Sequence, residues 1–576
     1  MLHARVKIKS RKSTVDVFFM KNIIYAHGQK LRIPPYKKGA IFDRAGYNLA
    51  AMTETPSTAN RQIARAAGTV MIAILFGQIA SLVNRILVAN AFPAAEVDAF
   101  FSANRVSETL FTLIAAGALG SAFLPTFTGL LVKDERSSAW KLASSLINLV
   151  TLILTLAALL ASIFAPQIVR YLLAPGLSQD LEVFNLTVEL LRIQSISAVL
   201  FGIGGLVISI LNAHQVFFIP QITAAMYQIG QIFGVLVLSR WLGIYGLAWG
   251  VVIGASLFLL VQLPSLFKLK GEYSFSLGLG NSDVLQVFQL MGPRVFGAAI
   301  VQLNFWVNNN LGSKMVEGSI QSLTYGFTLM VMAQAAIAQS VAIAAMPTFS
   351  AQHALGKVDE MRSSLAAALR GMFLLSLPAS LGLILLARPI VSMLFERGEF
   401  TSTITTMTAW ALAWYAAGLV GHSIMEVLTR AFYAQQDTKT PVIIGAIAMG
   451  LNVVFSFVFS GLFERIGWYP LGGLALANSL ATALEAVALF IFMRKRLNGI
   501  EGRSIWDGVW RVGLAGLGMG IGLLVWIQAV GSLSRWLVAL GGVALGGVIY
   551  FAGVLIFKVP EIKLLTQVVS NRIKRT

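Results

Sequence analysis

Long apolar runs recur along most of the chain and are separated by short polar stretches. Each run holds about 20 residues or more, the length that an α-helix needs to cross the hydrocarbon core of a bilayer. A β-barrel would need alternating segments of about 10 residues, and the sequence has none. The pattern therefore predicts an all-α, polytopic membrane protein with about fourteen transmembrane helices. The expected spans are 66–92, 98–131, 142–166, 187–212, 219–239, 244–267, 284–312, 319–347, 365–394, 405–432, 440–462, 468–492, 508–530 and 537–557.

The composition supports a membrane protein. Of 576 residues, 57% are hydrophobic and only 12% are charged, against about 25% charged in soluble domains, and the mean hydropathy is +0.76. The net charge of +19 could indicate a nucleic-acid partner. Cationic loops on one side of a membrane explain it better, because cytoplasmic loops carry an excess of Lys and Arg. We expect no nucleic acid among the partners.

The distribution of basic residues predicts the topology. With the N-terminus in the cytoplasm, the inner loops and the C-terminal tail hold eighteen Lys and Arg, whereas the outer loops hold seven. This bias is expected of an even number of spans with both termini inside.

The sequence lacks the residues for disulfides, a metal site and ATP hydrolysis. There is no cysteine, and no two of the five histidines lie at a ligand spacing, so we expect neither disulfides nor a metal site. There is also no phosphate-binding Walker sequence, so we do not expect the chain to hydrolyse ATP.

The N-terminal stretch differs from the rest. Residues 1–51 hold eleven Lys and Arg, with two acidic residues and no helical period, and a tail of this kind is usually disordered or attracted to membrane surfaces. Met52 begins the stretch MTETPSTANRQIARAAG, which resembles the short cytoplasmic N-terminus of a membrane protein. We interpret 1–60 as a basic, disordered tail, of which 1–51 is a mis-assigned upstream start or a dispensable segment.

The chain also repeats itself at an offset of about 222 residues. Leu124-Pro125-Thr126-Phe127 matches Met346-Pro347-Thr348-Phe349, and Ile168-Val169 through Gly176 matches Ile390-Val391 through Gly398. The offset covers six spans, so the two halves keep the same orientation in the membrane. We expect two parallel-repeat six-helix lobes, 61–275 and 276–500, around a central cavity. Residues 501–576 would add two C-terminal helices and a basic tail.

Ionisable groups inside membrane spans are costly, so they indicate a water-filled path or a buried pair. In the first two spans these groups are Arg85, Asp98, Arg105 and Glu108. Arg105 and Glu108 are three residues apart and could neutralise each other. The sequence leaves this structural pair and an anion-binding role equally open.

Later spans add further candidates. Arg294 follows Gly292-Pro293, where we expect a broken helix, and shares a polar face with Gln302 and Asn309. Glu485 is the lone carboxylate in an apolar span, where it could couple proton movement to transport or form a hydrogen bond to a neighbouring helix.

Several stretches resemble the MurJ/MviN lipid II flippases, a family of the multidrug/oligosaccharidyl-lipid/polysaccharide exporter superfamily. The resemblance covers about residues 66–560. The stretches are DAFFSANRVSETLFTLIAAGALGSAFLPTF at 98–127, LLAPG at 172–176, QLMGPRVFG at 289–297, LFERGEFT at 394–401 and FYAQQDTKTPV at 432–442.

The family's arginine motifs are largely replaced. Where its first helix usually has Ser-Arg and Arg-Asp, this chain has Gly77-Gln78 and Asn84-Arg85. Phe111-Thr112 stands where the second helix usually has Arg-Arg, and Phe327-Thr328-Leu329-Met330 where the eighth has Asp-Arg-Leu-Met.

The resemblance implies a flippase, not an enzyme, that moves a lipid-linked peptidoglycan precursor, lipid II, across the bacterial cytoplasmic membrane by alternating access. It implies no cofactor, a drive from the membrane potential or an ion gradient, a monomer in contact with membrane lipids, and envelope-synthesis partners that the sequence does not identify. Two alternatives are an exporter of another lipid-linked glycan or amphipathic solute, and an envelope scaffold that transports nothing.

Overall fold

The computed structural model describes residues 76–114 and 122–559. The expected N-terminal tail, the alternative start at Met52 and the basic C-terminal tail therefore lie outside the described residues. Every regular element within the described ranges is a helix, which confirms the all-α prediction.

A helix at 76–91 opens the described chain and is followed by the elements of the first half. These are α3 (Ala94–Ile114), α4 (Leu124–Val132), α5 (Arg136–Ile163), α6 (Ala165–Gln167), η3 (Ile168–Leu173), η4 (Leu177–Gln179), α7 (Leu181–Ala213), α8 (Phe218–Phe233), η5 (Gly234–Leu238), α9 (Ser239–Leu242), α10 (Ile244–Leu260) and α11 (Leu263–Lys268).

The second half of the described chain begins at α12. Its elements are α12 (Ser282–Ser313), α13 (Ser319–Gln334), η6 (Ala335–Gln339), α14 (Ser340–Ala354), α15 (Val358–Leu385), α16 (Ala387–Phe395), α17 (Ser402–Ala417), α18 (Leu419–Ala434), α19 (Lys439–Arg465), α20 (Leu471–Arg496), α21 (Gly502–Val530) and α22 (Arg535–Ile556).

Eleven helices of the described chain are long and apolar enough to cross a membrane. The pair α17 and α18, bent by 43° where they meet, makes a twelfth. These twelve match the expected spans from 142 to 557. The two remaining spans, 66–92 and 98–131, run into residues that the structure does not describe. A polytopic helical membrane protein is therefore confirmed.

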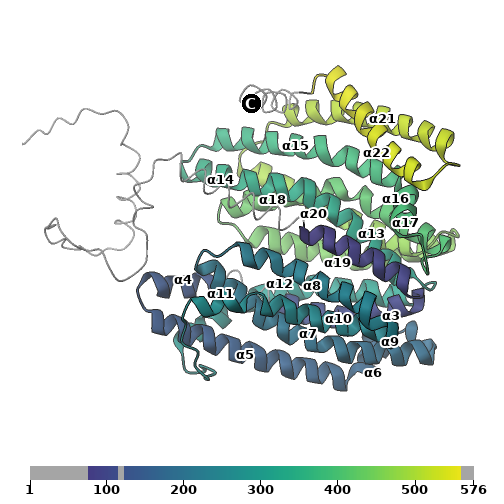
Figure 1. Cartoon of the computed structure of the whole chain (residues 1–576). Coiled ribbons are helices and arrows are strands. Elements are labelled where there is room, and N and C mark those ends of the chain that lie inside the picture. Colours follow the sequence, from purple (N-terminus) through teal and green to yellow (C-terminus); the bar gives the residue numbers. More distant parts are fainter. Residues whose placement is uncertain (1–75, 115–121, 560–576) are drawn as a thin grey trace, which may run out of the picture. The chain divides into compact units, whose positions relative to one another are not determined.

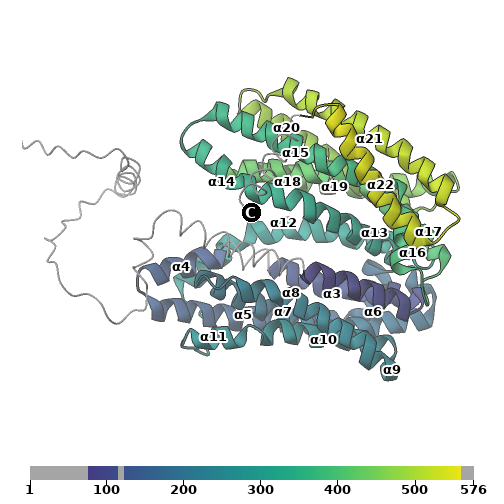
Figure 2. The same cartoon turned by 45° about the horizontal axis from the view of Figure 1, so that its top comes forward.

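The helices pack in two sets, with α12 in contact with both. In the first set α7 packs against α3, α5 and α10, and α10 packs against α8. In the second set α20 packs against α17, α18 and α19, and the pair α21–α22 packs against α15 and α16. α12 lies against α3 on one side and α19 on the other. Figure 2 shows the first set in purple to teal and the second in green to yellow.

Glycines set the close approach of two helices in the first set. A Cβ on Gly230 of α8 would lie 2.2 Å from the Cα of Gly254 on α10, and one on Gly234 would lie 2.7 Å from the Cα of Gly250. Small residues at four-residue spacing allow this backbone contact, which favours association where helices are surrounded by lipid.

At one end of the molecule the two sets are joined by two matching contacts. A Cβ on Gly176 would lie 1.8 Å from the carbonyl oxygen of Ser313, and one on Gly398 would lie 2.3 Å from that of Asn90. Gly176 also donates its N–H to the Ser313 hydroxyl at 3.1 Å. The two glycines are 222 positions apart, the offset of the sequence repeat.

Two acidic side chains strengthen the same end. Asp98 of α3 accepts backbone hydrogen bonds at the start of α13, and Glu317 accepts one from the N–H of Ala95 at 3.1 Å. We call this group of contacts the clasp. It consists of Asn90, Ala95, Asp98, Gly176, Ser313, Glu317, Gly318, Gln321 and Gly398.

Candidate functional site

A cavity of about 320 Å³ lies where the two sets of helices face each other. Its walls come from the helix at 76–91 and from α3, α12, α13, α17 and α20, which Figure 1 shows running near one another. Four of the seven residues that the sequence singled out for binding line it: Arg85, Arg105, Glu108 and Asn309.

Both cavity arginines lie over aromatic rings. The guanidinium carbon of Arg85 is 4.9 Å from the ring centre of Phe101, and that of Arg105 is 5.1 Å from the ring centre of Phe305. A cation over a ring face is attracted by the ring's quadrupole, more strongly where water is excluded. The rings thus hold each guanidinium from one side and leave its N–H edges for other partners.

Arg105 also forms an ion pair inside the cavity. Its Nη1 lies 2.9 Å from Oε2 of Glu108, and the two side chains are 17% and 49% exposed. The Nε–H of Arg105 is buried and has no acceptor among the described residues. Of the charged side chains that line the cavity, two are positive and one is negative, so the cavity carries one net positive charge.

Asn309 connects three elements while it lines the cavity. Its amide group donates to the Ser102 hydroxyl at 3.1 Å and to the carbonyl of Leu173 at 3.0 Å. Its own carbonyl oxygen is buried without a hydrogen-bond partner in the described chain. Such an unsatisfied group is a place for a water or ligand.

Two other candidates lie behind the cavity wall or at its end. Gln302 is buried between α12 and α3, where its carbonyl oxygen accepts from the Thr109 hydroxyl at 3.2 Å. Thr109 in turn accepts from the indole of Trp306 at 2.8 Å. Asp98 is buried in the clasp and does not line the cavity.

A ladder of neutral polar groups joins α12 to α19 next to the cavity. The side-chain amide oxygen of Asn304 accepts hydrogen bonds from the side-chain NH₂ groups of Asn308 at 3.1 Å and Asn452 at 3.2 Å. The hydroxyl of Ser456 donates to the side-chain amide oxygen of Asn308 at 3.0 Å. These bonds use other polar residues of α12 than Arg294, Gln302 and Asn309, the face that the sequence indicated. They fix that helix to the second set.

Arg294 and Glu485 lie away from the cavity lining. α12 runs unbroken through Gly292-Pro293, so the predicted broken helix is wrong; proline is tolerated in membrane helices because neighbouring groups satisfy the freed backbone. Arg294 follows on its exposed surface. Glu485 is 9% exposed and faces α19, where a Cβ on Gly445 would lie 3.1 Å from its Oε1.

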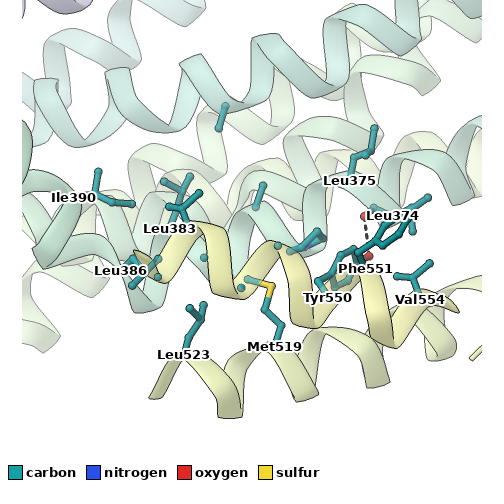
Figure 3. Close-up of a pocket in the computed structure, with 18 residues that line it drawn as sticks. Leu374, Leu375, Leu383, Leu386, Ile390, Met519, Leu523, Tyr550, Phe551 and Val554 are labelled. Atoms are coloured by element: carbon teal, nitrogen blue, oxygen red, sulfur yellow. Dashed lines mark hydrogen bonds between the residues drawn. The ribbon is translucent and has the colours of Figure 1, made fainter. Parts of the chain in front are cut away.

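An apolar groove of about 480 Å³ lies between α15, α16, α21 and α22, and Figure 3 shows its wall of aliphatic and aromatic side chains. None of the described residues that line it is charged. The hydroxyl of Tyr550 donates to the carbonyl of Leu374 at 2.7 Å, so this polar group is satisfied. Ala333 of α13 lines the groove, while its neighbours Val331 and Met332 line the cavity. The cavity and the groove therefore lie on different faces of the same turn of α13.

A family model described as "Lipid II flippase MurJ" matches residues 88–541. The chain belongs to the MurJ family. The resemblance noted in the sequence is thereby confirmed, and the family is one of flippases, which are transporters and not enzymes.

Individual relatives agree with this assignment. The chain is 30% identical over 442 residues to the lipid II flippase MurJ of Burkholderia cenocepacia, covering 75% of this chain and 84% of that one. It is 29% identical to the probable lipid II flippase MurJ of Vibrio cholerae, covering 83% and 91%.

The solved structures show the same fold. A lipid II flippase MurJ in an inward closed conformation superposes with a TM-score of 0.72 at 25% identity, covering 86% of this chain and 99% of that one. An inward-facing multidrug resistance transporter of the MATE family has a TM-score of 0.61 at 15% identity, covering 75% and 98%. This second likeness concerns the fold alone.

Sequence reasoning missed several uncharged residues of the cavity. Gln78 and Ser81 lie at helical spacing from Arg85, so a search along that helix face would have found them. The polar residues on α13 and α20 have no charged cavity residue on their own helix, so the sequence holds no such signal for them. The missed polar residues are Gln78, Ser81, Asn104, Thr324, Thr328 and Asn478.

Proposed function

We propose that this chain translocates lipid II, a diphosphate-linked peptidoglycan precursor, across the bacterial cytoplasmic membrane. Membership of the MurJ family supports the proposal. The observation that carries it in this chain is the cavity in which Arg85 and Arg105 are held over aromatic rings.

Two guanidinium groups suit a diphosphate. Arginine presents several N–H donors in a planar fork that binds phosphate oxygens in pairs, and these charge-assisted bonds are stronger than neutral ones. The unsatisfied Nε–H of Arg105 supplies one donor without breaking an existing bond. Glu108 keeps the net charge low, which favours release of the anion on the far side.

The apolar groove beside the cavity suits the hydrocarbon chain of the same substrate. It is open to the lipid-facing side of α22, where Phe551 is 54% exposed, and it is separated from the cavity by one turn of α13. With its head group in the cavity and its hydrocarbon chain in the groove, the substrate would cross the membrane while its hydrocarbon chain stays out of water.

Alternating access requires one end of the cavity to be closed while the other admits substrate. The basic loops favour cytoplasmic termini, which places the clasp on the outer side. In this arrangement the cavity loads from the cytoplasmic side, and the clasp must open for release.

The drive would come from the membrane potential or an ion gradient, without a cofactor. Glu485 is the candidate for coupling, because it is a buried carboxylate without a hydrogen bond or ion pair to another described residue. Its protonation state can therefore change without breaking a pair.

Single substitutions test the cavity. Arg85→Gln and Arg105→Gln should each weaken lipid II binding by about tenfold or more, and should fail to complement loss of the host flippase. Arg294→Gln is the matched control, because Arg294 is exposed and lies outside the lining. Equal effects of all three variants would overturn the proposal.

The pairing of Arg105 with Glu108 favours one alternative, a lipid-linked glycan with fewer negative charges. Binding to a panel of polyprenyl monophosphate and diphosphate glycolipids separates the two. Tighter binding of the monophosphates would favour the alternative.

A further inference from the structure

A second apolar groove, of about 620 Å³, lies on the other side of the second set of helices, among α15, α18, α20 and α21. Its volume falls within the range of about 300–1,000 Å³ that is usual for small-molecule sites. Among the residues that the structure describes, it shares no lining residue with the cavity or with the first groove.

Small residues make the floor of this groove. A Cβ on Gly421 of α18 would lie 3.2 Å from the Cα of Ala483 on α20, so these two helices approach closely there. Larger side chains from the flanking helices, among them Phe373 of α15 and Trp506 of α21, make the walls.

The groove opens toward the surroundings of the protein and not toward its interior. Val487 on α20 and Trp506 on α21 both line it and are 55% and 68% exposed. α15, α20 and α21 are each apolar and long enough to cross a membrane. The opening therefore faces lipid, which fills an apolar groove with hydrocarbon chains.

One cation lies at the end of the groove. Arg494, in the last turn of α20, lines the groove and is exposed. Its guanidinium group has no hydrogen bond or ion pair with another residue of the described chain, and only its backbone carbonyl is bonded, to the N–H of Gly499. Its neighbour Arg496, by contrast, is paired with Asp437. α20 ends at Arg496, so Arg494 lies at the level where a membrane span meets water and lipid head groups.

We propose that this groove binds an anionic glycerophospholipid of the surrounding membrane. An acyl chain lies over the floor formed by Gly421 and Ala483, and the phosphate of the head group accepts hydrogen bonds from Arg494. Charge distinguishes this groove from the first, which has no charged residue in the described part of its lining. The site is separate from the cavity, so it holds whether or not the cavity binds lipid II.

The head-group arm of the test uses native mass spectrometry of the full chain in detergent. We expect phosphatidylglycerol to bind more tightly than phosphatidylcholine, and Arg494→Gln to weaken phosphatidylglycerol binding by about tenfold, the effect of losing one charge-assisted bond. Lys495→Gln is the matched control, because Lys495 is exposed but does not line the groove. Equal losses in the two variants, or no preference for phosphatidylglycerol, would overturn the proposal.

A second experiment tests the position of the acyl chain by filling the groove with a larger side chain. Val487→Trp places a large ring in the opening and should remove the most tightly bound phosphatidylglycerol. Ile491→Trp, one turn along α20 on an exposed position outside the groove, should leave it in place. The proposal fails if Val487→Trp has no effect, if a polyprenyl diphosphate displaces phosphatidylglycerol from the groove, or if Val487→Trp instead dissociates a dimer.

Discussion

The carboxylate of Asp98 lies 2.7 Å from the backbone nitrogen of Gln321 and accepts its hydrogen bond. The second carboxylate oxygen accepts from the N–H of Gly318 at 2.8 Å. The first N–H groups of a helix have no partner within the helix, and a negative charge there is favoured by the helix dipole. Asp98 of α3 thus caps α13, a helix of the other half of the chain, and ties the two halves together.

Asp98→Asn should loosen the clasp. Asparagine keeps one acceptor oxygen but places an NH₂ group where the second oxygen accepted a bond, so one backbone N–H loses its partner. The chain has no cysteine, so a single cysteine at Thr328 in the cavity can report access. We expect Asp98→Asn to raise labelling by a membrane-impermeant maleimide from the outer side. Asp180→Asn is the control, because Asp180 caps only its own helix. Equal labelling in both variants would contradict the role of Asp98.

Gly398→Ala tests the glycine contacts of the clasp. The added Cβ would meet the Asn90 carbonyl at 2.3 Å, and the backbone φ of +56° adds strain. Gly467→Ala carries a similar strain, at φ +77°, but has no atom within 4 Å of the new Cβ. We expect both variants to lose some thermal stability and only Gly398→Ala to raise outer labelling of the cavity cysteine. A rise in both would assign the effect to strain and not to the clasp.

Glu108→Gln separates the two roles that the sequence leaves open for Arg105. If Arg105 binds the anion and Glu108 competes for it, removal of the carboxylate should tighten lipid II binding several-fold while slowing release. Binding is measured by native mass spectrometry and turnover in proteoliposomes. If the pair only holds the helix, Glu108→Gln should leave binding unchanged and Arg105→Gln should lower only stability.

The lowered pKa of Asp437 predicts how the stability of the fold depends on pH. Asp437 lies between α18 and α19, outside the membrane spans. Burial raises the pKa of Asp437, but hydrogen bonds from the N–H and hydroxyl of Thr440 and the guanidinium of Arg496 together lower it to about 2. Because the folded pKa is below the ordinary value of about 3.9, the carboxylate stabilises the fold above that pH. The contribution is lost as the pH falls through about 2.

Asp437 accepts hydrogen bonds from the backbone N–H groups of Lys439 and Thr440 at the start of α19. Asp437→Asn should therefore cost about 1 kcal/mol near neutral pH, the usual size of a helix cap. The difference from the parent chain should shrink between about pH 4 and pH 2, as measured by thermal unfolding in detergent. Asp359→Asn is the control, because the ion pair of Asp359 with Arg362 is largely exposed and should contribute little. A difference that stays constant over this pH range would contradict the role of Asp437.

The fold was predictable from sequence because hydrocarbon leaves few choices. A span in such a protein must be helical and apolar, so the twelve spans from 142 to 557 are readable without partners, including the one that bends between α17 and α18. Charges inside spans identified Arg85, Arg105 and Glu108 for the same reason.

The rest of the site depends on contacts between distant helices. Nothing in the local sequence shows that Asp98 caps α13 or that Gln302 turns toward Thr109. The sequence predicted a break at Gly292-Pro293 because a proline removes one backbone hydrogen bond of a helix, yet α12 continues through both residues. The repeat did contain one usable signal, because Gly176 and Gly398 occupy matching places in the clasp.

The most direct measurement is lipid II translocation in proteoliposomes with the clasp closed by a reversible link. Ala95→Cys with Glu317→Cys, in this cysteine-free chain, would be bridged by a short bis-methanethiosulfonate, because the Ala95 N–H and the Glu317 carboxylate lie 3.1 Å apart. Each cysteine displaces a sulfinate and forms a disulfide, which a reductant cleaves. We predict that the unlinked variant translocates lipid II, that the link stops translocation, and that reduction restores it. Translocation that continues at the same rate with the clasp linked, or that is absent from the unmodified chain, would contradict transport through this cavity by alternating access.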